Sequence, residues 1–192
     1  MRFRVIGMGI AILLALAISA RDRLTRGAPP HDLRGWVVLD IDYAPDEQTM
    51  IREAEWIVRA RPLGSPEPIA YSSDGRLVSL VQTVQVLEVL KGPTPIPHLR
   101  ILRLSVTPEA RAQGFRIAEE EGGFSGPLPP GEYLLFLTAS AKPGIWAVVG
   151  HSQGILALND RGQVIATGAY GFSTWVGMDI TDIRERIKAA SR

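Results

Sequence analysis

The sequence predicts a mainly β domain, built as a sandwich or a barrel, with a short helix near its N-terminal side and a second helix at its C-terminus. The chain has 192 residues, of which 46% are hydrophobic and 21% charged, a composition that fits one folded domain better than disorder. Short apolar runs follow one another closely, and glycines and prolines separate them. This punctuation is typical of all-β folds.

The first 20 residues have the pattern of an export segment. A basic start, Met1–Arg4, precedes an uncharged and mostly apolar run over residues 5–20, which ends abruptly at Arg21. The run is shorter than the roughly 20 residues that an untilted membrane helix prefers. Residues 1–20 are therefore predicted to be either a cleaved signal peptide or an N-terminal membrane anchor. Both alternatives place the rest of the chain outside the cytoplasm, secreted or tethered by residues 5–20.

The rest of the chain divides into a linker and one domain. Residues 21–34 mix charges with glycine and proline and show no periodicity, so they are predicted to be a linker. Residues 35–192 are predicted to form a single domain. Within it, the segment Pro45–Glu55 has the pattern of a short helix, with Pro45 in the first turn and Asp46 at the positive end of the helix dipole.

Strands are predicted at the apolar runs that the turn residues separate. In chain order the runs are Trp36–Ile41, Trp56–Ala60, Arg76–Leu90, His98–Val106, Glu132–Thr138, Ile145–Val149, Ile155–Leu158 and Gln163–Thr167. The strand that begins at Trp56 is predicted to end after Ala60, where four chain breakers follow: Pro62, Gly64, Pro66 and Pro68.

Two of these strands also carry predictions about their faces and partners. In the second half of His98–Val106, leucine and valine alternate with Arg103 and Ser105, so the apolar residues are expected to face the core. The runs Ile145–Val149 and Ile155–Leu158 are expected to pair with each other around the turn between them. At the C-terminus, the segment Thr181–Ala190 is predicted to be an amphipathic helix with Thr181 as its N-cap.

Charge and cysteine content exclude several function classes. The formal net charge is +1, and without Arg2 and Arg4 of the leader the remainder has 19 basic and 20 acidic residues. A nearly neutral domain has no strong field to attract nucleic acid, so no nucleic-acid partner is expected. The chain has no cysteine, which excludes thiol chemistry, cysteine-ligated zinc and a thioether-linked lipid anchor.

The segment Gly150–Gly154 (GHSQG) fits the G-x-S-x-G pattern of a nucleophile elbow, in which Ser152 would attack an ester. The elbow needs a helix after the serine, yet Ile155–Leu158 has the pattern of a strand. It also needs a histidine further along the chain, and none follows His151. A glycine-bracketed turn is therefore the favoured interpretation, and a serine hydrolase is the alternative.

No metal or cofactor site is predicted. The three histidines, His31, His98 and His151, are dispersed and form no ligand pair. Asp40, Asp42 and Asp46 lie close in sequence. An EF-hand pattern nevertheless fails there, because alanine and proline stand at the next ligand and glycine positions. Solvated strand-edge charge is expected for these aspartates. The acidic residues 119–121 are expected in a solvated loop.

The four tryptophans are candidates for a surface that stacks on a sugar or an aromatic ligand. They are Trp36, Trp56, Trp146 and Trp175. Tryptophans isolated within apolar strands more often belong to the core. Trp175 lies in the glycine-flanked segment Gly168–Gly177, so its exposure is the informative test.

Several short motifs, taken in order, resemble netrin-like domains. The entry strand Glu53–Ala60 (EAEWIVRA), the strand end Val89–Pro93 (VLKGP), the strand Gly131–Leu137 (GEYLLFL) and Gly154 with its apolar successors carry the likeness. The resemblance covers about residues 46–190 and implies a five-stranded OB-type barrel, closed or partly open, with a terminal helix. Tissue inhibitors of metalloproteinases belong to this family and act through an N-terminal cysteine, which this chain lacks. The resemblance therefore implies the fold and not the inhibitory function.

The expected function is that of a non-enzymatic binding or interaction module outside the cytoplasm. Its partner is expected to be an unidentified protein or envelope component, with membrane contact only through residues 5–20 and with no catalytic, cofactor or metal residue. The long loop-rich segment Thr107–Gly131 is expected to form part of the recognition surface. Two alternatives stay open: an exported hydrolase that uses Ser152, and a structural envelope protein.

Overall fold

A computed structural model describes residues 36, 37, 39, 41–93, 96–117, 124–168 and 170–190. The chain from Gly35 to Arg192 forms one compact unit. The predictions for residues 1–34, a signal peptide or anchor followed by a linker, lie outside the described residues. Strand accounts for 44% and helix for 18%, so the protein is mainly β, as predicted.

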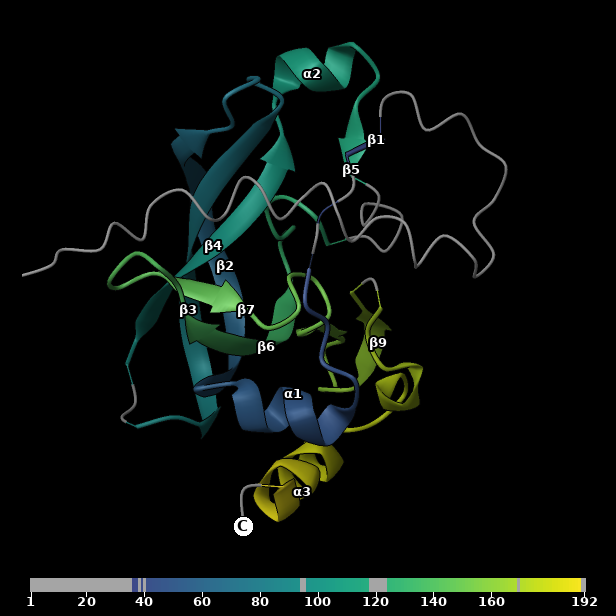
Figure 1. Ribbon diagram of the computed structural model, residues 1–192. Coiled ribbons are helices and arrows are strands. Elements are labelled where there is room, and N and C mark those ends of the chain that lie inside the picture. The colour runs from purple at the N-terminus through teal and green to yellow at the C-terminus, as the bar shows by residue number, and fades with distance from the viewer. Residues whose placement is uncertain are drawn as a thin grey trace, which may run out of the picture. The chain divides into compact units, whose positions relative to one another are not determined.

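The centre of the fold is a closed barrel of five strands (Figure 1). They are β2 (Trp56–Tyr71), β3 (Leu77–Lys91), β4 (His98–Val106), β6 (Glu132–Ala139) and β7 (Trp146–Val148). Their order around the barrel is β2-β3-β4-β7-β6, and β6 pairs with β2 to close it. Among the five barrel strands, only the neighbours β4 and β7 run parallel, and the pair Ile101–Trp146 joins them. The β4–β7 seam therefore joins the barrel through one residue pair.

The remaining elements extend or cover the barrel. Strands β8 (Ile155–Leu158) and β9 (Val164–Thr167) continue the sheet from β6, and β1 (Trp36–Val37) pairs with β5 (Arg116–Ile117). The helices in the described residues are α1 (Glu47–Glu53), α2 (Pro108–Ala112), the short 3-10 helix η4 (Ser173–Trp175) and α3 (Ile180–Ala190). A short helix on the N-terminal side and a C-terminal helix were both predicted, and both are confirmed.

Strand β2 is much longer than predicted. It continues to Tyr71, so the predicted end after Ala60 is wrong. Beyond Ala60, among the described residues, β2 pairs only with β3, and most of its side chains are exposed. Because proline lacks an N–H, an edge strand tolerates it where no ladder bond is required. A register shift between Leu63 and Glu67 accommodates part of the run of chain breakers.

From Leu99 to Ser105 the two faces of β4 are the reverse of the prediction, whereas Val106 is buried as predicted. The side chains that alternate into the buried face are Leu99, Ile101, Arg103 and Ser105. Leu102 and Leu104 are only half-buried on the other face. The periodicity was correct and the direction was wrong, because the guanidinium of Arg103 donates to backbone carbonyls inside the fold.

Strands β7 and β8 do not pair with each other, which corrects the prediction. Both pair with the same edge of β6: Leu137 lies opposite Val148, and Leu135 lies opposite Ile155. The intervening residues therefore form an insertion opposite Phe136. Phe136 receives a hydrogen bond from the Val149 N–H and donates one to the Gly154 carbonyl.

Two large apolar clusters hold the domain together, and a third, smaller one gathers Val106, Ala110 and Ile117. The first fills the barrel interior and includes Val58, Val84, Leu99 and Leu135. The second lies between the outer face of the β2–β6–β8 sheet and helices α1 and α3, which lie side by side at one end of the molecule (Figure 1). Burying both faces of β6 explains why this strand is a continuous apolar run.

The helix ends differ from prediction by one or two residues. Asp46 caps α1 by accepting a hydrogen bond from the Thr49 N–H at 2.7 Å, so Pro45 lies before the helix and not in its first turn. Asp179, and not Thr181, accepts from a first-turn N–H of α3, the N–H of Thr181 itself at 2.8 Å. Both aspartates satisfy N–H groups that a helix end leaves without an intrahelical acceptor.

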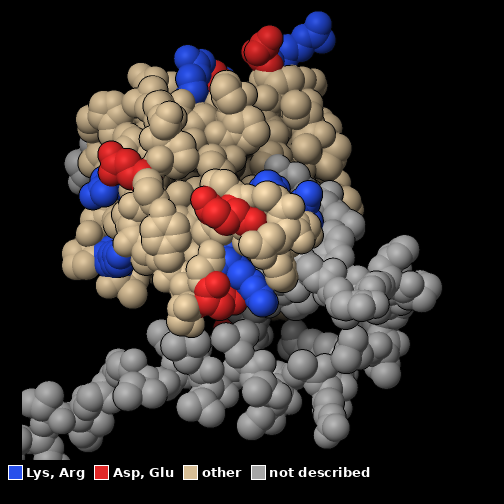
Figure 2. Space-filling view, turned by 90° about the horizontal axis from the view of Figure 1, so that it is seen from above, with Lys and Arg blue, Asp and Glu red and all other residues tan. Residues whose placement is uncertain are grey.

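The charged side chains form no single-sign surface on the face that Figure 2 shows. Acidic and basic groups lie there singly or beside a group of opposite charge. Among the described residues, none of the helices is both long and apolar enough to cross a bilayer.

Candidate functional site

The segment Gly150–Gly154 folds into a tight turn that closes on itself. The Gly154 N–H donates to the Val149 carbonyl at 3.0 Å, and the His151 N–H donates to the Val148 carbonyl at 3.1 Å. Gly150 and His151 both have positive φ, +58° and +57°. The left-handed region suits glycine and is uncommon for histidine, which marks His151 as strained.

Ser152 is buried inside this turn and has none of the geometry of a nucleophile. Its side chain is fully buried, and its Oγ has no hydrogen-bond partner among the described residues. Gly168 packs so closely that a Cβ there would lie 1.7 Å from the Ser152 carbonyl oxygen. A β-strand follows the turn where an elbow needs a helix.

The side chain of Gln153 connects the turn to two other segments of the chain. Its Oε1 accepts from the Ala44 N–H at 2.8 Å, and its Nε2 donates to the Ala44 carbonyl at 2.9 Å. The same Nε2 donates to the Tyr170 carbonyl at 3.2 Å. A Cβ on Gly150 would meet Gln153 Oε1 at 2.5 Å, so this glycine makes room for the buried amide.

His151 lines a pocket beside the β4–β7 seam. The pocket has a volume of about 240 Å³ and is walled by Ser79, Leu102, Leu104, Ala147, Val148 and His151. We call it the seam pocket. Strands β3, β4 and β7 supply five of its walls, and the turn after β7 supplies His151.

The imidazole of His151 is held neutral. Both of its ring nitrogens are buried and have no hydrogen-bond partner among the described residues. Burial lowers the pKa of His151 to about 4, and the positive charge of Arg103 lowers it further in the same direction. A neutral imidazole offers one donor and one acceptor at neutral pH.

Arg103 is the functional-site residue that sequence reasoning missed. It is fully buried, and its guanidinium donates to the carbonyls of Phe124 and Gly126. Its Nη1 has no partner among the described residues. Burial lowers the pKa of Arg103 to about 10, which still leaves it charged at neutral pH. The available signal was an arginine in the middle of an apolar alternation.

Gln82 of β3 holds the same segment of backbone. Its amide donates to the Leu128 carbonyl at 3.0 Å and accepts from the Leu128 N–H at 2.8 Å. Phe124 and Leu128 place their side chains in the barrel cluster. The described end of the predicted recognition loop therefore packs into the barrel, and the buried side chains of Arg103 and Gln82 hold its backbone. We call residues 124–128 the barrel plug.

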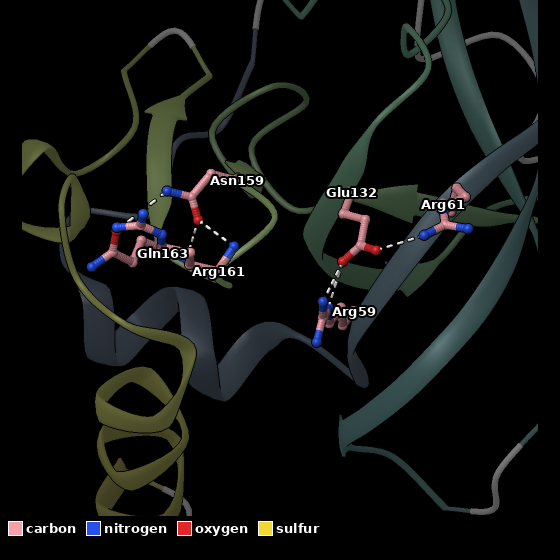
Figure 3. A network of polar contacts seen from close by, with 6 residues as sticks. All are labelled: Arg59, Arg61, Glu132, Asn159, Arg161 and Gln163. Carbon is pink, nitrogen blue, oxygen red and sulfur yellow. Dashed lines mark hydrogen bonds and ion pairs between the residues drawn. The ribbon is translucent and has the colours of Figure 1, made fainter.

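A second polar cluster lies where β2 meets β6 (Figure 3). Glu132 accepts from Arg59 Nε and from Arg61 Nη2, each at 2.7 Å. Burial acts to raise the pKa of Glu132, but the hydrogen bonds from Arg59 and Arg61 outweigh it and hold the pKa below its usual value. Arg61 is exposed, so this ion pair is a weak contributor to stability. Figure 3 also shows Asn159 bridging its hairpin turn to Arg161 and Gln163.

The other sequence-predicted residues are not brought together. His98 is exposed at the start of β4, Asp42 is exposed outside any strand, and Asp46 is the α1 cap. His31, Asp40 and residues 119–121 lie outside the described residues. In the described part of the chain, no three histidine or acidic side chains gather as a metal site would require.

The tryptophans lie in the two large apolar clusters wherever their side chains are described. Trp175, the candidate for exposure, is fully buried against Phe136, with ring centroids 5.2 Å apart. Trp56 is buried in the barrel cluster, and its ring meets Trp146 edge to face. The side chain of Trp36 lies outside the description.

The sequence matches no model of a known protein family, and it matches no curated protein.

Proposed function

We propose that the protein is a non-enzymatic binding module that works outside the cytoplasm and holds a small ligand in the seam pocket. One observation carries this proposal: the seam pocket gathers four apolar walls beside the two polar residues Ser79 and His151. Ligand sites typically combine apolar walls with a few placed polar groups. The netrin-like resemblance, a partner in the cell envelope and export by residues 1–20 belong to the same proposal.

The competing hydrolase is disfavoured by the position of Ser152. A nucleophile needs access to substrate and a base within hydrogen-bond reach. The buried hydroxyl of Ser152 has neither among the described residues. Removing an unsatisfied buried hydroxyl relieves a desolvation penalty. The Ser152→Ala variant is therefore expected to unfold at the same or a higher denaturant concentration than the wild type.

The same variant separates the two functions. We expect wild type and Ser152→Ala to hydrolyse short p-nitrophenyl esters equally slowly, at the rate of buffer. A wild-type rate well above buffer that collapses in folded Ser152→Ala would establish the hydrolase instead.

Binding is tested with benzyl alcohol, a neutral probe that one small pocket can hold. We expect it to shift the NMR signals of His151 and Ala147 in the wild type. The Ala147→Leu variant fills the pocket from β7 and should abolish the shift, whereas Ala139→Leu, at an exposed strand position, should not. If no pocket signal moves, the protein fits the structural envelope alternative.

A further inference from the structure

Strands β3 and β4 line the seam pocket with one face of their sheet. Ser79 lies opposite Leu104 in the β3–β4 pairing, and Leu102 lies two residues before Leu104, so the three side chains share that face. Arg103, between the two leucines, belongs to the opposite face, where it donates to carbonyls of the barrel plug. Its guanidinium is not among the described walls of the pocket.

The imidazole of His151 offers carbon atoms to the pocket and not its nitrogens. Both ring nitrogens are buried, so a ligand in the pocket does not reach them. The walls from β7, Ala147 and Val148, are apolar as well. Among the described walls, Ser79 is therefore the residue whose side chain can make a hydrogen bond to a ligand.

These walls favour a ligand without charge. Moving an ionised carboxylate or ammonium from water onto apolar walls costs free energy unless polar groups replace its hydration. The hydroxyl of Ser79 can replace only part of it, because it makes one hydrogen bond as a donor. An uncharged apolar body instead gains free energy, since binding removes its surface and that of the walls from water.

We infer that the seam pocket binds a small uncharged ligand whose apolar body is one ring or a short branched chain, with Ser79 as the partner of one hydroxyl. The size follows from the volume of about 240 Å³, which is below the roughly 300–1,000 Å³ of typical ligand sites. This inference rests on the proposed function and names the class of ligand for it.

Four probes with one ring test the charge preference: toluene, benzyl alcohol, benzoate and benzylamine. Each is titrated into the wild-type protein and followed by NMR. Toluene and benzyl alcohol are expected to shift the signals of His151 and Ala147. Benzoate and benzylamine should both bind at least about tenfold more weakly than benzyl alcohol, because each loses hydration that the walls do not replace.

The Ser79→Ala variant tests the hydrogen bond. It should weaken benzyl alcohol several-fold and leave toluene unchanged, because toluene has no hydroxyl. An equal effect on both probes would overturn the role of Ser79. The Ala147→Leu variant should abolish binding of both. If that variant does not fold, Ser79→Ile fills the pocket from β3 and should have the same effect.

The outcomes separate the two proposals. Benzoate or benzylamine binding as tightly as benzyl alcohol would overturn the inference of an uncharged ligand and leave the pocket as a binding site. If none of the four probes moves the His151 and Ala147 signals, the proposed function falls and the inference falls with it. Binding that survives in folded Ala147→Leu or Ser79→Ile as well as in the Ala139→Leu control would place the ligand elsewhere and overturn both.

Discussion

At the scale of single residues, the buried face of β4 sets the electrostatics of the barrel. Arg103 keeps its charge inside the fold because the Phe124 and Gly126 carbonyls replace water around its guanidinium. Its positive charge adds to the effect of burial, which lowers the pKa of His151 and holds the imidazole neutral. One arginine thus both fixes the barrel plug and tunes the wall of the seam pocket.

The first prediction concerns the acid stability that His151 confers. Its pKa is about 4 in the fold and about 6.5 when unfolded, so the unfolded chain binds the extra proton between these values. Stability that is present above pH 6.5 is therefore lost as pH falls toward 4, by at most about 3 kcal/mol. In urea titrations from pH 7 to 4, the free energy of unfolding of His151→Asn should fall less than that of the wild type. Asparagine tolerates positive φ and does not titrate. His98→Asn, at an exposed position, should keep the wild-type curve; equal slopes in all three proteins would contradict the assignment.

The second prediction concerns Gly92 in the turn after β3. A Cβ at this position would lie 2.4 Å from Cε3 of Trp56, and φ is +151°. Because overpacking and backbone strain add, Gly92→Ala should lower the free energy of unfolding by about 3 kcal/mol. Gly75→Ala is the matched control, since Gly75 has φ +69° and open space around it. Gly75→Ala should lower the free energy of unfolding by about 1 kcal/mol, from backbone strain alone. Equal losses in the two variants would show that the Trp56 ring moves aside at little cost.

At the scale of elements, the end of β3 and the end of α1 stabilise each other. Lys91 donates from Nζ to the Ile51 carbonyl at 2.7 Å and to the Arg52 carbonyl at 3.2 Å. These carbonyls lie in the last turn of α1, where a helix leaves acceptors unsatisfied and favours a cation. Lys91 and Gly92 thus have different physical roles: Lys91 binds the end of α1, and Gly92 leaves room for the ring of Trp56.

The third prediction tests the Lys91 cap. Lys91→Met keeps most of the aliphatic stem and removes the ammonium, so it should destabilise the protein by about 1 kcal/mol. Hydrogen exchange should quicken in α1 more than in β6. Lys142→Met, at an exposed turn, should leave both unchanged. Uniform quickening across the domain would show that Lys91 supports the whole fold and not this helix end.

Local sequence patterns predicted where the strands lie, but not which strands pair or which face of a strand is buried. The bounds of β4 and β8 agree with the apolar runs, and β3 lies within one residue of its run, because periodicity is a property of adjacent residues. The face of β4 and the shared partner of β7 and β8 depend on residues far along the chain, such as Phe124 and Leu135. The seam pocket was out of reach for the same reason: its walls come from three strands and one turn.

At the scale of the whole molecule, the buried amide of Gln153 joins three distant segments. It binds the backbone of Ala44 before α1, and it also binds the carbonyl of Tyr170 after β9. Tyr43 and Tyr170, whose ring centroids are 4.5 Å apart, cover the junction. The G-x-S-x-G match is therefore explained by packing, since its glycines make space and its glutamine makes the bonds.

The fourth prediction follows from that junction. Gln153→Ala leaves the Ala44 N–H and carbonyl buried without their partner, and each unsatisfied group costs about 1–3 kcal/mol. We expect a loss of about 3 kcal/mol in the free energy of unfolding, with the segment before α1 becoming the first site of proteolytic cleavage. Gln48→Ala, on the exposed side of α1, is the matched control and should change neither property. Because the Gln153 bonds tie residues 109 positions apart, their loss should free the first segment while the barrel stays folded. If the variant instead unfolds in one step with unchanged cleavage sites, the segment before α1 and the barrel unfold together, and the Gln153 bonds do not hold that segment separately.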